Sequence, residues 1–142
     1  MTEDKLYKIT CNKRQLQLIS IACDLVSRLQ CCQFDHITNV VQPRDFGLEN
    51  ENFTRLRYFR ETLLEIKEYF DLNINSSYGI FSPEVQNSAR TWWDMHQVIR
   101  NKLAYESNPG ITPENRWEKG KITVDFDEPA HSDKENELIK IS

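Results

Sequence analysis

The sequence predicts an α+β domain in which three helices pack with a small antiparallel sheet. Three stretches carry apolar residues three and four positions apart, the spacing that forms one continuous helical face. Short β-prone runs stand before the first of these stretches and after the last. We expect the N-terminal strand to pair with the C-terminal strands beside the helices. Residues 1–142 are predicted to form a single domain.

The N-terminal strand is predicted at residues 6–10, where polar and apolar side chains alternate. Asn12 then caps the first helix, and Gln15 three residues later completes an approximate capping box. The apolar stripe begins at Leu16 and continues to about Val41. The sequence therefore predicts one long first helix.

Two further helices are predicted, each preceded by a loop. Residues 42–52 form the first loop, and residues 73–81 form the second. Ser82 and Pro83 are predicted as the N-cap and first position of the third helix, which stops near residues 108–110. The apolar stripe of the second helix consists of Phe53, Leu56, Phe59, Leu63, Ile66 and Phe70. The stripe of the third helix consists of Val85, Ala89, Trp92, His96, Ile99 and Leu103.

The C-terminal part of the chain has a different pattern. Residues 108–120 are predicted to be a connector, with Trp117 as its one apolar anchor. Residues 121–127 alternate apolar and polar side chains, and residues 137–142 are also β-prone, so both runs are predicted strands. Between them, residues 128–136 lack core residues and are expected to form a loop.

The composition argues against several classes of protein. The net charge of −4 disfavours a general DNA-binding protein, because phosphate contacts need a basic surface. No apolar run is long enough to span a membrane, so we expect a cytoplasmic protein without a membrane partner. The four cysteines fall in the first quarter without a CxxC pair and are typical of buried thiols in a reducing compartment. No histidine has zinc-ligand spacing, so no metal site or cofactor is expected.

Polar and aromatic side chains of the third helix are the first candidates for ligand binding. Arg100 can hold a phosphate or carboxylate with its planar guanidinium, and Asp94 and Gln97 can accept hydrogen bonds from hydroxyls or a base. Trp93 offers either a stacking surface or a second core contact. The alternative for Arg100 is a structural pairing with Asp94 or with the C-terminal strands.

Two further groups are candidates. Arg57 and Arg60 point outward near the start of the second helix, where they form either an anion site or surface ion pairs with nearby glutamates. Tyr78, Phe81 and Ser82 precede the third helix, whose free N–H groups can bind an anion. Phe81 either stacks on a base or packs against the helix start as a hydrophobic staple.

Catalysis finds little support in the sequence. There is no GxSxG, no HxxxH and no Gly-rich phosphate loop, and no Cys/His order suggests a nucleophile. We therefore expect a binding protein rather than an enzyme.

Three segments resemble a family of small phage proteins: residues 16–37 (LQLISIACDLVSRLQCCQFDHI), 89–109 (ARTWWDMHQVIRNKLAYESNP) and 122–129 (ITVDFDEP). This family resembles the Thoeris anti-defence sponges, which bind cyclic ADP-ribose isomers made by bacterial immune enzymes and remove them without cleavage. Some of those proteins also bind cyclic oligonucleotides at a second site. The chain departs from the pattern at Cys31-Cys32 and at Trp92-Trp93.

The resemblance implies a phage-encoded binder that sequesters a cyclic nucleotide immune signal in the cytoplasm of an infected bacterium. A recessed pocket is difficult to close with three helices, so we expect a homo-oligomer in which the first helix contacts a partner copy. The main alternative is a phage accessory protein that inhibits a host protein by direct binding. A small hydrolase of the same signal is a third possibility.

Overall fold

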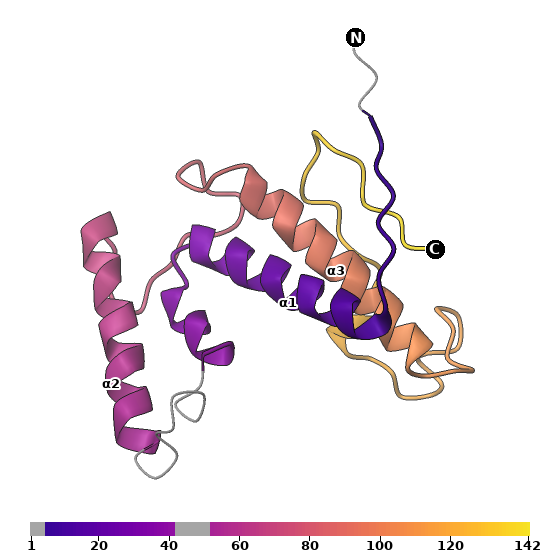
Figure 1. The fold of residues 1–142 in the computed structure, drawn as a ribbon, viewed down its shortest axis with the longest axis horizontal. Helices are drawn as coiled ribbons and strands as arrows, with labels where there is room; N and C mark the ends of the chain where they lie inside the picture. The colour runs from indigo at the N-terminus through magenta and orange to yellow at the C-terminus, as the bar shows by residue number, and fades with distance from the viewer. Residues whose placement is uncertain (1–4, 42–51) are drawn as a thin grey trace.

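The computed structural model describes residues 5–41 and 52–142 (Figure 1). Within these residues the protein is helical. Its elements in chain order are α1 (Lys13–Gln30), η1 (Phe34–Asn39), α2 (Asn52–Glu65), η4 (Ile66–Phe70), α3 (Ser88–Glu106) and η5 (Val124–Phe126), where η marks a 3-10 helix.

An antiparallel pair of helices, α1 and α3, forms the centre of the fold (Figure 1). Lys13 Nζ at the start of α1 donates to Ser107 Oγ beyond the end of α3, and Gln30 at the other end donates to Ser88 Oγ. The contact face of α1 is built from small side chains, and Ser27 Oγ donates to the carbonyl oxygen of Ala89 at 3.0 Å. Small residues allow two helix axes to approach closely, which explains why Ala89 has no exposed surface.

The first helix begins as predicted but is shorter. Asn12 accepts a hydrogen bond from the Gln15 N–H while the Gln15 side chain accepts from the Asn12 N–H, so the capping box is confirmed. The helix ends at Gln30, because Cys32 has a φ of +60°, a left-handed conformation that cannot continue an α-helix. The apolar residues that follow belong to η1 instead, so the prediction of one helix to Val41 is wrong.

The third helix ends where predicted, at Glu106, but starts at Ser88 rather than Pro83. Ser82 is not its cap, because the Ser82 hydroxyl donates to the Glu84 carboxylate. The Val85 N–H closes a turn on the Ser82 carbonyl, which directs the Val85 side chain into the core beside Cys31 and Ala89. Burial of Val85 therefore outweighs the local helix-start signal.

The predicted antiparallel sheet is wrong, and with it the α+β class, since no strand occurs among the residues that the structure describes. Leu6, Tyr7 and Ile9 of the predicted N-terminal strand are 79–93% exposed. Residues 121–127 contain η5, and residues 137–142 have no regular structure. A β-prone run forms a strand only where a neighbouring strand pairs with it, and neither the N-terminal nor the C-terminal runs have such a neighbour among the described residues.

Polar side chains of α3 take the place of that sheet by binding the backbone of the C-terminal segment. Asn101 Nδ2 donates to the carbonyl oxygens of Asp125 and Asp127, and the Tyr105 hydroxyl donates to that of Phe126. Further along, the Gln97 amide exchanges two hydrogen bonds with the backbone of Ala130. The segment therefore runs along α3 in the opposite direction to the helix.

The second helix is confirmed over its predicted length, although its last turn, η4, is 3-10. It projects away from the α1–α3 pair and packs mainly on η1 (Figure 1). The preceding loop, predicted at residues 42–52, lies outside the described residues except for Asn52, at which α2 begins. The single-domain prediction stays a prediction.

Candidate functional site

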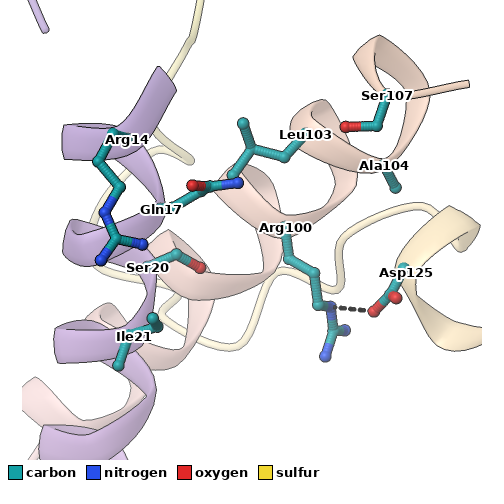
Figure 2. A pocket seen from close by; sticks show the side chains of 9 residues that line it. All are labelled: Arg14, Gln17, Ser20, Ile21, Arg100, Leu103, Ala104, Ser107 and Asp125. Atoms are coloured by element: carbon teal, nitrogen blue, oxygen red, sulfur yellow. Dashed lines mark ion pairs between the residues drawn. The ribbon is translucent and has the colours of Figure 1, made fainter. Parts of the chain in front are cut away.

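A shallow groove of about 480 Å³ lies between α1 and α3 near the start of α1 and the end of α3 (Figure 2). α1 contributes polar side chains to one wall and α3 contributes the other wall, while one carboxylate comes from the C-terminal segment. The lining residues are Arg14, Gln17, Ser20, Ile21, Arg100, Leu103, Ala104, Ser107 and Asp125. The groove thus combines two guanidinium groups, neutral hydrogen-bonding groups and a small apolar floor.

Arg14 and Arg100 place two guanidinium groups in the lining of the groove, the side-chain group that can hold an anion. Arg14 is exposed and makes no ion pair or hydrogen bond with the rest of the described chain. Arg100 Nε lies 3.3 Å from Asp125 Oδ1 but is buried without a well-aligned hydrogen bond. Asp125 is the single carboxylate in the lining and pairs with Arg100, so the positive charge of Arg14 remains to be matched by a ligand.

A polar network lies beside the groove and joins the two helices. His96 Nδ1 is 2.9 Å from Ser20 Oγ and 3.1 Å from the Ser20 carbonyl oxygen. Because a carbonyl can only accept, Nδ1 carries the proton of the neutral ring and is not placed to take the proton of the Ser20 hydroxyl. Burial lowers the pKa of His96 below its ordinary value, outweighing the opposite effect of Asp24, 3.9 Å from Nε2.

The network continues along α1 to an arginine that shields Trp93. Arg28 Nε donates to Asp24 at 2.9 Å, and its guanidinium lies 5.8 Å from the centre of the Trp93 ring. Trp93 also contacts the His96 ring, with 5.5 Å between the ring centroids. The indole of Trp93 is therefore packed against side chains of its own chain, outside the lining of the groove.

Asp94 and Gln97, two predicted ligand residues, bind the C-terminal segment. The Asp94 side chain accepts from the Ser132 N–H at 2.9 Å with both oxygens and from the Asp133 N–H at 2.7 Å with Oδ2. Asp94 is 4% exposed, so the segment covers it. Gln97 is engaged with Ala130 in the same way. The structure thus separates these two residues from Arg100, which alone among the predicted residues lines the groove.

The other predicted residues lie away from the groove. Arg57 pairs with Glu61 and Arg60 with Asp35, both at the surface. The remaining three residues precede α3: Tyr78 packs on the core and donates to the Phe70 carbonyl, Phe81 is 65% exposed beneath the Arg90 guanidinium, and Ser82 donates to Glu84. The structure therefore brings Tyr78, Phe81 and Ser82 near one another but not to Arg57, Arg60 or Arg100.

Sequence reasoning missed the α1 wall of the groove. Arg14, Gln17, Ser20, Asp24 and Arg28 recur three or four positions apart, so the signal was a polar stripe at helical spacing. Such a stripe is usually solvated, and only the position of α3 shows that part of it faces another helix.

Comparisons with protein-family models, curated proteins and solved structures found no match to this chain. No group of three potential metal ligands occurs within residues 5–41 and 52–142. None of the helices in this described part is long and apolar enough to cross a membrane.

Proposed function

We propose that this protein binds a small phosphate-bearing ligand in the α1–α3 groove without transforming it. The observation that carries the proposal is that Arg14 and Arg100 line one groove whose lining holds a single carboxylate, that of Asp125, which pairs with Arg100 (Figure 2). Guanidinium groups bind phosphate oxygens in a planar, bidentate geometry, and Gln17 and Ser107 supply neutral partners for hydroxyl groups.

The sequence resemblance makes a cyclic nucleotide the first ligand class to test. Sequestration of such a signal in the cytoplasm of an infected bacterium would require tight binding and release of the intact molecule after denaturation. The expected contact of α1 with a partner copy stays a prediction.

Ligand capture and release tests the proposal directly. The purified protein is incubated separately with cyclic ADP-ribose isomers, cyclic dinucleotides and linear ADP-ribose, separated from free ligand, and heat-denatured before the released compound is identified. We expect intact ligand. Release of a cleaved product would contradict non-catalytic binding. A failure to capture any of these compounds would contradict nucleotide sequestration and favour the protein-binding alternative.

Substitution of the two arginines tests the location of the site. Arg14→Ala and Arg100→Ala should each weaken binding roughly ten- to 150-fold, which corresponds to loss of a charge-assisted contact of about 1.5–3 kcal/mol. Arg14 makes no ion pair or hydrogen bond with another described residue, so Arg14→Ala should leave the melting temperature nearly unchanged. Lys119→Ala, which removes an exposed cation outside the groove, is the matched control. Unchanged affinity in both arginine variants would place the site elsewhere.

A further inference from the structure

The second helix buries only one side of its surface. Leu63 is buried, and Lys67 donates to the Ile74 carbonyl at 3.3 Å from that same side. Arg60 pairs with Asp35 of η1. The main contacts of α2 are with η1 and η4, and Figure 1 shows that the helix projects beyond the α1–α3 pair. A large part of its surface is therefore open.

A continuous stripe of side chains occupies part of the open surface. Arg55, Phe59, Thr62, Ile66 and Tyr69 follow one another at intervals of four, three, four and three residues, the seven-residue repeat of two paired helices. Side chains three apart are aligned in a 3-10 turn, so Ile66 and Tyr69 stay in line through η4. All five residues are exposed, and Tyr69 is 88% exposed.

The apolar character of this stripe is reinforced by its neighbours. Tyr58 is 64% exposed and lies next to the stripe on the helical surface, and Phe70 is 47% exposed although its ring packs on Phe34 of η1. Tyrosine, phenylalanine and isoleucine side chains concentrated on one helical face are typical of the centre of protein interfaces. A phosphate-bearing ligand would gain little from such a face, whereas another helix would bury it.

The charges of α2 and η4 identify the partner as a second copy and set its direction. Arg55, Arg57 and Arg60 precede Thr62 in the rod formed by residues 52–70, with Glu61 as the one acidic residue among residues 52–61. Glu65 and Glu68 follow Thr62, and the one cation on that side, Lys67, is buried. Parallel pairing of two copies would oppose like charges, whereas antiparallel pairing opposes arginines with glutamates at both ends. Within one chain Arg57 pairs with Glu61 and Arg60 with Asp35. Both arginines lie at the surface, where such pairs contribute little, so neither pair prevents this exchange.

We infer that α2 and η4 form a homodimer contact in which two copies pack antiparallel, with the two-fold axis near Thr62. A two-fold contact presents the same patch on both subunits, which requires the patch to be complementary to itself. The reversal of charge between the two halves, around an apolar stripe centred on Thr62, meets this requirement. The inference does not depend on the ligand proposed for the groove.

Sedimentation equilibrium in the micromolar range tests the contact. The 142-residue chain should sediment with about twice its own mass of 16.8 kDa. Ile66→Glu should weaken association about tenfold or more, because it places a charge in the centre of an apolar contact. Ile122→Glu, the same change at an isoleucine that is 61% exposed and outside α2, should leave association unchanged. Helical circular dichroism equal to wild type shows that each variant is folded.

Three outcomes would overturn the inference. The first is a monomer mass for the wild-type protein. The second is a dimer that Ile66→Glu leaves intact and Leu18→Glu dissociates, which would assign the contact to α1, because Leu18 is 48% exposed and lies outside the groove lining. The third applies if Ile66→Glu misfolds and the wild-type protein is a dimer. In that case the inference is overturned if the double variant Glu65→Lys/Glu68→Lys associates as strongly as wild type.

Disulfide crosslinking tests the direction of pairing. In a Cys11→Ser background, which removes the one cysteine that is not buried, Arg55→Cys and Tyr69→Cys chains are oxidised separately and as a mixture. Antiparallel packing brings position 55 of one copy to position 69 of the other, so only the mixture should yield abundant crosslinked dimer. Crosslinking of each variant with itself, and none across the mixture, would show parallel packing and overturn the inference.

Discussion

Replacement of Asp94 should release the C-terminal segment from α3 and destabilise the protein. The Asp94 carboxylate is 4% exposed and accepts hydrogen bonds from two backbone donors, the Ser132 and Asp133 N–H groups, at 2.7–2.9 Å. A hydrogen bond to a charged group contributes about 1.5–3 kcal/mol. With two donors at the lower end of this range, Asp94→Ala should lower the free energy of unfolding by about 3 kcal/mol.

The lower end of the range of hydrogen-bond free energies applies here, because the freed Ser132 and Asp133 N–H groups can bind water once the segment separates from α3. The loss is therefore limited to the free energy that holds residues 130–136 in place. For a chain of this size, about 3 kcal/mol corresponds to a fall in melting temperature of roughly 10 °C. Asp94→Asn should cost less, because its single carbonyl oxygen can still accept from both donors without the charge.

Urea denaturation gives the change in unfolding free energy, and amide hydrogen exchange locates it. The Ser132 and Asp133 amides should be protected in the wild-type protein and should exchange rapidly in Asp94→Ala. Glu137→Gln, at a carboxylate that is 91% exposed, is the control and should behave as wild type. Rapid exchange of both amides in the wild-type protein would refute the reasoning, as would a stability loss in Asp94→Ala without any change in their protection.

Three other predictions follow from burial. Because burial lowers the pKa of His96, the unfolded chain takes up a proton below about pH 6.5 that the folded chain does not, so the unfolding free energy should fall on acidification. Urea titrations at several pH values measure this free energy, and an increase on acidification would contradict the prediction. Ile99→Ala should cost about 2–5 kcal/mol, whereas Ile122→Ala should have little effect in the same assay. A thiol reagent should modify Cys11 first, since burial raises the pKa of the other three cysteines, Cys23, Cys31 and Cys32; equal labelling rates would show that these thiols are accessible.

The candidate site was predictable only in part. Arg100 was identified because its residue type and helix position suit an anion, and it lines the groove. Asp94 and Gln97 have equally suitable side chains, but both already form hydrogen bonds with the backbone of the C-terminal segment. Their partners lie more than thirty residues away in the chain, and no local pattern distinguishes a carboxylate that binds a ligand from one that binds a distant backbone.

The sequence by itself determined the features that depend on neighbouring residues. The capping box at Asn12, the extent of α2 with η4 and the end of α3 are such features, because hydrogen bonds and helical periodicity within a few residues decide them. The end of α1 at Gln30, the late start of α3 and the groove were decided by the tertiary structure.

The predicted sheet shows why this division exists. Apolar and polar side chains alternate in the C-terminal runs, as they do in strands. This alternation shows only which side chains are apolar, and it does not show which groups form hydrogen bonds with the backbone. In the folded protein, Asn101 and the Tyr105 hydroxyl supply hydrogen bonds to the backbone of residues 125–127 in the first of these runs. A β-prone segment becomes a strand when another strand offers these bonds, and here side chains of a helix offer them instead.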